Sequence, residues 1–389
     1  MAVYISNIRL VNFRLFKKAE LELHPELCVF LGDNGSGKTA ILDALSMLIS
    51  GIFPYCNYQP RIKAIPYALH NFLTWSAPLR GKQRIVRADV SGIVGVMSHT
   101  RMDGKEKHLE WLALSIGQKI STGEDVSIPS TKRDIANAYN LCVECGQGIP
   151  AFAHYGPHRG AEQGDRKRFK RRKINYTNPF AAYINSLHPS LDFDAFLEWF
   201  SEEEASELRE QRKTKGYVSK ELDAVRRAIE QVFFHAERHC FDPRFESNPK
   251  RFVITETSTS GESLEREFDQ LSDGYRGMIA LVSDFARRLA IANQYTEEDP
   301  LLGEGVLIID EIDAHLHPKW QYRVIDDLRR TFPNVQLIVS THSPEVVSTV
   351  DKASVYILNS VNGTSGRTPG TSDCSQLPGR YCGNCHERT

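Results

Sequence analysis

Three observations predict an α/β fold organised around a parallel sheet. Short, largely apolar runs with β-branched residues occur at 306–309 and 335–339, as is typical of buried parallel strands. Segments with helical spacing of apolar residues lie before and between them, at about 274–293 and 318–331. Near the start of the chain, an apolar run at 27–31 leads through a glycine-rich loop into another helical segment. We therefore expect both ends of the chain to contribute to one sheet.

The composition is that of an average soluble globular protein with roughly two to three domain-sized units. The 389 residues are 41% apolar and 25% charged, with 48 lysines and arginines against 49 aspartates and glutamates. A formal charge of -1 gives no general attraction to nucleic acid or to a membrane surface, so either partner would need a local patch. Because no apolar stretch of about 18 residues and no leader pattern is present, we expect a cytoplasmic protein without a membrane contact.

The middle of the chain interrupts the α/β pattern. Between about 191 and 240, two charged amphipathic segments flank Gly216, and they predict a helical hairpin with arms of roughly 20 residues. Further strands are expected at 3–11, 20–23, 84–96 and 108–115. The predicted organisation is an N-terminal lobe over 1–175, a helical insertion over 176–245, a C-terminal lobe over 246–360 and a loose tail over 361–389.

The loop at 32–39, here called the phosphate loop, has the sequence G-D-N-G-S-G-K-T and matches the pattern G-x-x-x-x-G-K-[ST]. It stands between a predicted strand and a predicted helix at 40–49, where backbone N–H groups can surround phosphate oxygens. Lys38 is expected to neutralise the β and γ phosphates, and the Thr39 hydroxyl to bind Mg²⁺. The predicted nucleotide-binding residues of this loop are Asn34, Gly35, Ser36, Gly37, Lys38 and Thr39. ATP and Mg²⁺ are the expected cofactors.

Two carboxylates, Asp310 and Glu311, follow the apolar run at 306–309, and we call them the acidic pair. Because side chains alternate along a strand, the two are expected to do different jobs. Asp310 would support Mg²⁺, directly or through water, and Glu311 would act as general base on the attacking water. The alternative is a strand that simply ends in solvated acids.

The next apolar strand delivers Thr341, His342 and Ser343 to the same end of the sheet. A histidine at this position can hydrogen-bond the γ-phosphate or the attacking water, so His342 is the second predicted catalytic residue. The alternative is a histidine that caps the end of a strand.

In this order, the motifs resemble the ABC-type ATPases of the SMC and RecF-like group, which are P-loop NTPases. The string D-E-I-D-A-H-L-H-P at 310–318 matches the pattern of one branch of that group. The segment L-S-D-G-Y-R at 271–276, here called the signature loop, stands where the group carries L-S-G-G-Q. The resemblance implies an ATPase head with an inserted helical subdomain, in which Ser272 and Gly274 cap the γ-phosphate bound to an opposite subunit.

Asp273 departs from the commonest form of this loop, and its charge would lie near a phosphate. It could turn away or accept a backbone hydrogen bond. A simple helix cap by Ser272 or Asp273 is the alternative interpretation of the signature loop.

A narrower resemblance is to the PtuA-like ATPases of Septu and retron-associated anti-phage systems. It rests on a start that resembles I-x-N-F-R, on the phosphate loop, and on M-I-A-L-V-S-D-F-A-R at 278–287, and it covers about 1–50 and 265–358. It implies a homodimer or higher oligomer of ATP-sandwiched heads that controls a separately encoded HNH-type nuclease. The alternatives are a RecF-like ATPase in DNA repair or recombination, and an ATP-locked scaffold with little hydrolysis.

Three further features have two interpretations each. The run from Arg166 to Lys173 has seven cations in eight residues and could bind nucleic acid, or it is a solvated loop. The pairs Cys142/Cys145 and Cys382/Cys385 have zinc-ligand spacing, or they are reduced thiols.

The third is the loop at 155–159, which by the same resemblance approaches the nucleotide, or is a surface turn at Gly156 and Pro157. Gln147 and Gln163 are available for the metal-contacting glutamine of the wider family, although neither stands out.

Overall fold

The computed structural model describes residues 2–65, 89–97, 99–102, 105–108, 112–117, 130–157, 174–237, 240–247 and 250–358. The run from Arg166 to Lys173, Gln163, Cys382, Cys385 and the predicted tail lie outside these residues. The domain boundaries proposed from the sequence stay predictions. Among the described residues, no helix combines the length and apolar character needed to cross a membrane.

The central sheet has five parallel strands in the order β14–β3–β13–β12–β8. They are β3 (Leu27–Gly32), β8 (Ala151–Tyr155), β12 (Gly305–Ile309), β13 (Val335–Thr341) and β14 (Val355–Leu358). Every residue of β8, β12 and β13 is buried, as a parallel sheet covered on both faces requires. The predicted α/β fold is confirmed. The carboxyl ends of all five strands meet at one edge.

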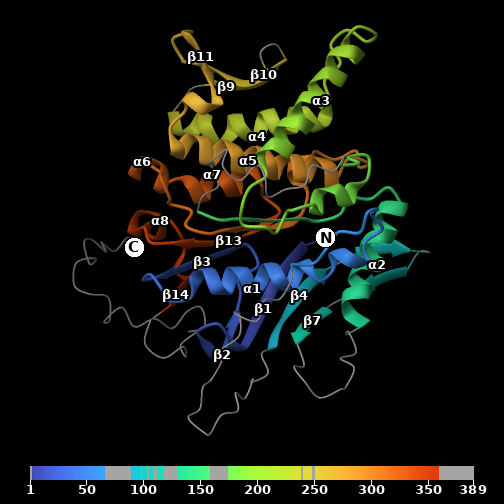
Figure 1. Ribbon diagram of the computed structural model, residues 1–389, viewed down its shortest axis with the longest axis vertical. Coiled ribbons are helices and arrows are strands. Elements are labelled where there is room, and N and C mark those ends of the chain that lie inside the picture. Colours follow the sequence, from blue (N-terminus) through green and yellow to red (C-terminus); the bar gives the residue numbers. More distant parts are fainter. Residues whose placement is uncertain are drawn as a thin grey trace, which may run out of the picture.

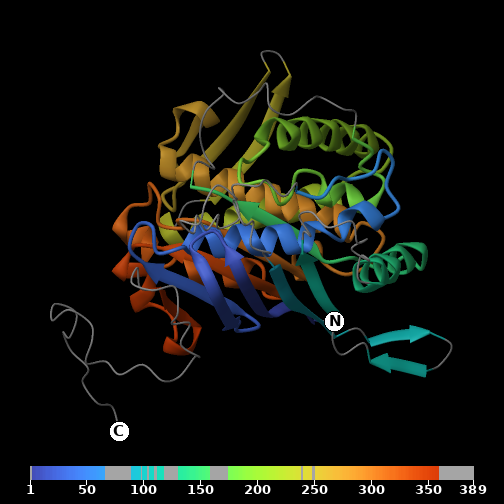
Figure 2. The same ribbon diagram turned by 60° about the horizontal axis from the view of Figure 1, so that its bottom comes forward.

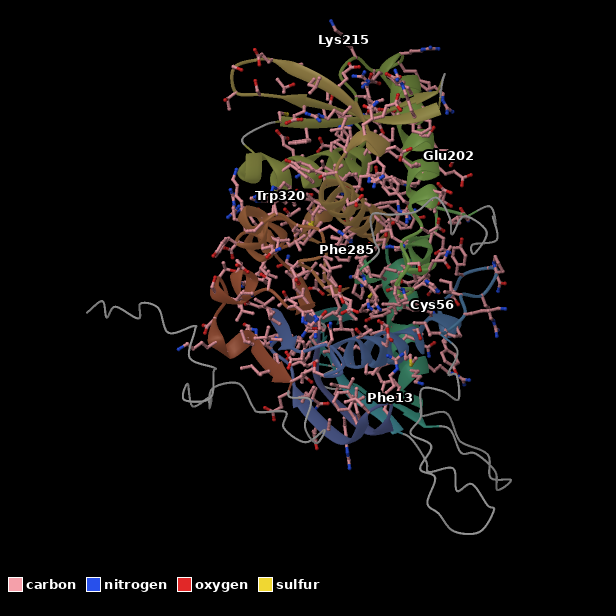
Figure 3. All side chains as sticks on the ribbon, turned by 60° about the vertical axis from the view of Figure 1, so that its left-hand side comes forward. Phe13, Cys56, Glu202, Lys215, Phe285 and Trp320 are labelled. Atoms are coloured by element: carbon pink, nitrogen blue, oxygen red, sulfur yellow. The ribbon has the colours of Figure 1, made fainter. Side chains whose placement is uncertain are left out.

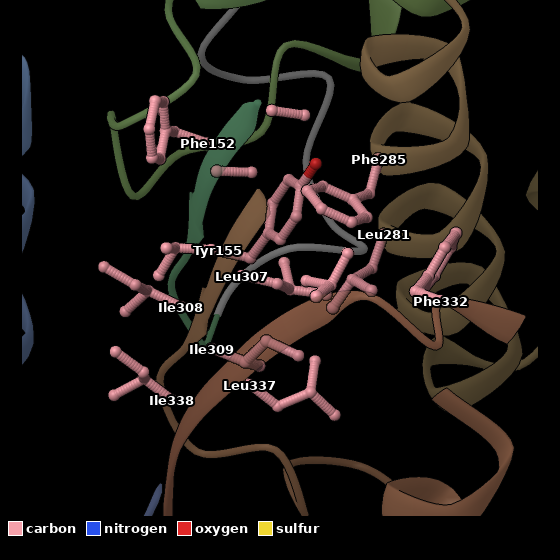
Figure 4. Packing of buried hydrophobic residues seen from close by; sticks show 14 of the residues in the cluster. Phe152, Tyr155, Leu281, Phe285, Leu307, Ile308, Ile309, Phe332, Leu337 and Ile338 are labelled. Carbon is pink, nitrogen blue, oxygen red and sulfur yellow. The ribbon is translucent and has the colours of Figure 1, made fainter. Parts of the chain in front are cut away.

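One long helix covers each face of this sheet. Helix α1 (Lys38–Ser50) packs on one face and α5 (Asp273–Ala292) on the other. In Figure 4, Leu307 lies toward Phe285 of α5, whereas Ile308 and Ile338 point to the opposite face. This alternation lets β12, which is wholly apolar, contribute side chains to the cores on both faces of the sheet.

A second, antiparallel sheet of four strands, in the order β2–β1–β4–β7, lies beyond α1. Its strands are β1 (Ala2–Phe13), β2 (Phe16–Glu22), β4 (Asp89–Met97) and β7 (Leu112–Gly117), close to the predicted strands. Gln336 of β13 ties the two sheets, since its amide donates to the carbonyl oxygens of Ile5 and His24, both at 2.9 Å, and accepts from the Ile5 N–H at 2.8 Å. A hairpin of β5 (His99–Met102) and β6 (Lys105–His108) projects from the body in Figure 2, and α2 (Ser130–Glu144) precedes β8.

The predicted helical hairpin consists of α3 (Phe193–Gln211) and α4 (Lys220–Glu237), with 19 and 18 residues. Gly216 adopts a φ of 81° in the turn between them, and Figure 3 places Lys215 at this tip. Arg226 of α4 pairs with Glu207 of α3 at 2.9 Å. Helix α4 packs along α5, so this helix belongs to the body of the molecule and does not form a free-standing arm.

A three-stranded sheet that the sequence reading did not predict covers the outer side of these helices (Figure 1). Its strands, in the order β11–β10–β9, are β9 (Cys240–Ser247), β10 (Lys250–Thr257) and β11 (Ser263–Glu267). Phe252 of β10 meets Phe196 and Phe200 of α3 edge to face, with ring centroids 5.8 and 5.3 Å apart. Aromatic packing therefore fixes this sheet on α3.

The helix predicted at 318–331 is wrong as a single element, because it is divided into α6 (Pro318–Gln321) and α7 (Val324–Thr331). Trp320 of α6 packs against the ring of Phe233 of α4, with centroids 4.9 Å apart, and α7 also packs against α4. Helix α8 (Pro344–Ser348) follows β13. Short 3-10 helices are η1 (Phe53–Tyr55), η4 (Pro179–Tyr183), η5 (Phe268–Gln270), η6 (Pro300–Leu302) and η7 (Lys352–Ser354).

Candidate functional site

The phosphate loop joins the carboxyl end of β3 to the first turn of α1. Gly35 and Gly37 have φ angles of 81° and 101°, which glycine adopts without strain. Gly37 also lies against Phe16, since a Cβ atom there would be 2.6 Å from the Phe16 ring. Asn34 and Gly35 are exposed at the rim. The loop is therefore shaped by its glycines and supported from below by the antiparallel sheet.

Lys38 is buried inside this loop. Its ammonium group donates to the carbonyl oxygens of Gly32 at 2.7 Å and Asp33 at 3.1 Å. Burial lowers the pKa of Lys38, and the carboxylates of Asp310 and Glu311 act in the opposite direction. The cation is thus held at the strand edge close to the acidic pair, where phosphate oxygens would meet it.

Ser36 offers an independent sign that the loop fits a phosphate. Its hydroxyl oxygen is buried and has no hydrogen-bond partner in the described part of the chain. An unpartnered buried hydroxyl costs free energy, so such a group calls for an explanation. A phosphate oxygen lying in the loop would supply the missing acceptor, and the residues present fit a bound nucleotide.

Thr39 and Asp310, predicted as the Mg²⁺ ligands, are brought together from opposite ends of the chain. The Thr39 hydroxyl donates to Asp310 Oδ2 at 2.8 Å. Asp310 is 4% exposed, its other carboxylate oxygen accepts from the Ser340 hydroxyl, and its N–H donates to the Tyr155 carbonyl oxygen at 2.8 Å. Hydroxyl and carboxylate oxygens are the donor set that Mg²⁺ prefers, so these residues fit the metal.

Glu311 diverges from Asp310 for a reason that differs from the expected one. Strand β12 ends at Ile309, so strand alternation does not separate the two side chains. Instead, Glu311 adopts a left-handed φ of 47°, and its N–H donates to the Ser340 hydroxyl oxygen at 2.8 Å. Ser340 therefore holds both members of the acidic pair. Sequence reasoning missed it, although a serine directly after the largely apolar run at 335–339 was the available signal.

His342 lies directly after β13 and is exposed. Its N–H donates to Asp313 Oδ1 at 3.3 Å, and its imidazole makes no hydrogen bond within the described residues. The strand therefore delivers His342 to the same edge as the phosphate loop and the acidic pair, with its ring nitrogens available to a ligand.

The signature loop opens α5 as expected, but the side chain of its serine does not cap the helix. Ser272 occupies the N-cap position without a side-chain hydrogen bond to the helix. Asp273 pairs with Arg276 one turn later, and this hydrogen bond lowers the pKa of Asp273. The alternative of a cap by Ser272 is thus wrong. Asp273 therefore pairs with Arg276 of its own helix, and this pairing compensates the negative charge that would otherwise lie near a phosphate.

Gly274 connects the signature loop to the acidic pair of the same chain. A Cβ atom at this position would be 2.5 Å from the carbonyl oxygen of His315. His315 itself has a left-handed φ of 61° in the turn that follows the acidic pair. The start of α5 and this turn are therefore in direct backbone contact.

A buried charge cluster, formed by Asp284, Arg287, Arg288 and Tyr155, links the middle of α5 to β8. The Tyr155 hydroxyl, which lies on the α5 side of the sheet in Figure 4, donates to Asp284 Oδ2 at 2.7 Å. Arg288 Nε donates to the same oxygen at 2.8 Å, and Arg287 pairs with the other. Burial acts to raise the pKa of Asp284, but Arg288 and Arg287 outweigh it and hold the pKa below its usual value.

The remaining candidates divide as follows. Tyr155 places the beginning of the 155–159 loop beside Asp310, while His158 and Arg159 lie outside the described residues. Gln147 precedes β8 and so lies at the opposite edge of the sheet, which rules it out as the metal-contacting glutamine.

Cys142 is buried and Cys145 is exposed. Within the described ranges, no group of three or more potential metal ligands occurs, so zinc stays a prediction that depends on the second cysteine pair.

Comparisons with known families identify two matching regions. The family model described as "AAA domain, putative AbiEii toxin, Type IV TA system" matches residues 143–348, more than half of the chain. A second model, described as "AAA ATPase domain", matches residues 3–77, which include the phosphate loop.

Three curated relatives share parts of the sequence. The retron Vc95 probable ATPase of Vibrio cholerae serotype O1 biovar El Tor is 26% identical over 409 aligned positions, covering 92% of this chain and 74% of that protein. The Septu protein PtuA of Bacillus mycoides is 41% identical over 78 residues, 20% of this chain. The DNA replication and repair protein RecF of Mesorhizobium japonicum is 33% identical over 124 residues, 31% of this chain. The chain spans only 10% and 24% of the length of the PtuA and RecF relatives.

Among solved structures, the SMC head domain from Thermotoga maritima aligns with a TM-score of 0.48 at 16% identity, covering 95% of this chain and 100% of that one. The resemblance to SMC- and RecF-like ATPases of the PtuA and retron type is confirmed by the named relatives. By its match over residues 143–348, the chain belongs to the AAA domain family of the first model.

Proposed function

We propose that the chain binds ATP with Mg²⁺ and hydrolyses it. The observation that carries this proposal is the 2.8 Å hydrogen bond between Thr39 and Asp310, which joins the phosphate loop to the acidic pair. Lys38 would bind the phosphates, Thr39 and Asp310 the metal, and Glu311 would accept a proton from water. Bound Mg²⁺ supplies charge neutralisation at the phosphates. His342 would contact the γ-phosphate and report its presence.

Hydrolysis is tested by single-turnover cleavage of ATP, followed by release of phosphate. Glu311→Gln should keep nucleotide affinity and lose cleavage, because the amide cannot accept the proton. Lys38→Ala should lose binding itself. If the wild-type chain binds ATP but cleaves it no faster than Glu311→Gln, the chain is an ATP-locked scaffold, which is the second candidate function.

We infer further that two heads share each nucleotide, with Ser272 and Gly274 of one chain completing the site of the other. The support is that the Ser272 hydroxyl is exposed and is not used as a cap, at the start of a 20-residue helix. Chains with Lys38→Ala and chains with Ser272→Arg should each be inactive. A mixture should recover about a quarter of wild-type activity, because half of random dimers are mixed and each holds one intact site of two. No recovery in the mixture would contradict sharing.

The biological setting that we propose is anti-phage defence, in which this ATPase controls a separately encoded HNH-type nuclease. The support is the similarity to proteins named as retron and Septu ATPases. The similarity to RecF favours repair or recombination as the alternative. Purification of the tagged chain together with the products of its neighbouring reading frames separates the two, since only the defence proposal requires a nuclease subunit that binds in an ATP-dependent manner.

A further inference from the structure

Two turns approach each other at the carboxyl edge of the sheet. The first follows the acidic pair and runs from residue 312 to 317, and the second, here called the sensor turn, consists of residues 341–343 after β13. The Ile312 N–H donates to the Ser340 carbonyl oxygen at 2.9 Å, which brings the two together at their base. The position of His342 therefore depends on the further contacts that hold residues 341–343.

Asp313 makes the contacts that do this. A single carboxylate oxygen, Oδ1, accepts from the Thr341 hydroxyl at 2.6 Å and from the His342 N–H at 3.3 Å. The Thr341 hydroxyl oxygen in turn accepts from the Ser343 N–H at 2.9 Å. One carboxylate therefore organises all three residues of the sensor turn.

Gln321 of α6 adds a second tie between the same two turns. Its amide nitrogen donates to the Leu316 carbonyl oxygen at 2.8 Å, and its amide oxygen accepts from the Ser343 hydroxyl at 2.7 Å. The first turn is thus braced from both sides, so the Asp313 carboxylate is presented from a fixed backbone. The His342 ring, with no hydrogen bond of its own in the described residues, is oriented only through its backbone.

From this geometry we propose that Asp313 is the positioning residue for His342, and that it sets the preference of the site for a nucleoside triphosphate over a diphosphate. Asp313 does not itself touch the nucleotide. It holds the backbone of the sensor turn so that the imidazole meets the γ-phosphate. This inference rests on the proposed function of the site, because it assigns His342 to the γ-phosphate.

The test measures the dissociation constants of Mg-ATP and Mg-ADP by competition with a fluorescent nucleotide, using full-length protein. Asp313→Ala should reduce the preference for ATP over ADP by about 10- to 100-fold, the value of hydrogen bonds to a charged acceptor, and leave ADP affinity within about threefold. Asp313→Asn should retain most of the preference, because its amide oxygen still accepts both bonds. Asp326→Ala, an exposed aspartate on α7, is the matched control and should change nothing.

His342→Ala should lower the preference to the same level, and the double variant Asp313→Ala/His342→Ala no further, because the two act as one unit. Multiplying effects in the double variant would overturn the proposal, and so would an Asp313→Ala variant that melts earlier but keeps its preference. If Asp313→Ala does not fold, Thr341→Val removes the same contact from the other side and should also lower the preference.

Wild-type behaviour separates this inference from the proposed function. Equal affinity for ATP and ADP would overturn positioning of a γ-phosphate sensor, whereas nucleotide binding would still be supported if Lys38→Ala abolishes it. Absence of any nucleotide binding would overturn both. Absence of hydrolysis alone leaves the measured preference as a valid test of Asp313.

Discussion

Replacing Asp284 with asparagine is expected to destabilise the fold by about 3–5 kcal/mol, because it leaves two buried cations without their counter-charge. Asp284, Arg287 and Arg288 are 1%, 4% and 3% exposed. Their charges are thus almost entirely removed from water, and Asp284 is the carboxylate that pairs directly with both arginines. The guanidinium of Arg288 keeps hydrogen bonds to the carbonyl oxygens of Ala182 and Ile184, at 2.7 and 3.0 Å, which places the expected loss toward the lower value.

Thermal unfolding followed by circular dichroism measures this loss. For a chain of 389 residues each kcal/mol corresponds to about 1.2 °C, so the melting temperature should fall by about 4–6 °C. Tyr155→Phe removes only one hydrogen bond to the carboxylate and should cost about 1–3 kcal/mol. Asp326→Asn on the exposed face of α7 serves as the matched charge change and should melt with the wild type. If Asp284→Asn also melts with the wild type, the buried charge cluster does not stabilise the fold as argued.

Three further predictions follow from single contacts. Ser340→Ala frees both members of the acidic pair and should lower kcat for ATP hydrolysis about 10- to 100-fold with nucleotide affinity nearly unchanged, and an unaltered kcat would contradict its role. Gly274→Ala places a methyl group 2.5 Å from the His315 carbonyl oxygen and should lower the melting temperature by an amount equivalent to about 1–3 kcal/mol; a wild-type melting curve would show that the start of α5 does not need this contact. Burial raises the pKa of Glu304 from 4.5 to about 7, so the folded state keeps a proton that the unfolded state releases, and stability should fall as pH rises through this window. Glu304→Gln should therefore gain in melting temperature over the wild type between pH 5 and pH 8, and a constant difference would refute the assignment.

Sequence patterns were sufficient for the central sheet because its strands are recognisable without their neighbours. The apolar runs that became β3, β12 and β13 were predicted within two residues at each end, and the start of α5 within one residue. The motifs also placed Thr39 and Asp310 at one Mg²⁺ ion. This was possible because each follows a strand whose carboxyl end a parallel sheet brings to the same edge. These features depend on local periodicity and on the topology of parallel strands.

The rest depended on contacts that periodicity does not encode. In the sheet of β9, β10 and β11, strand β11 is mostly polar and exposed and so lacks the apolar signal used elsewhere. Strand β10 has a buried apolar run, but it covers only Phe252, Val253 and Ile254. The helix predicted at 318–331 kept its apolar spacing but is divided between Gln321 and Val324, although Trp320 and Val324 on either side of the break are both buried. The roles of Ser340 and Asp313 arise from hydrogen bonds between two turns about 30 residues apart, which no local pattern reveals.

The backbone contact between Gly274 and His315 couples the position of the signature loop to the position of the turn that follows the acidic pair. Any displacement of the start of α5 must push on the turn that begins with the acidic pair, because no side chain lies between them to absorb the movement. If a second head contacts Ser272, the resulting displacement of α5 would therefore move Glu311 of the same chain. Through Ile312 and Asp313, it would also move His342. In a symmetric pair, each chain would contact the nucleotide of its partner through Ser272. The same contact would adjust the positions of its own Glu311 and His342.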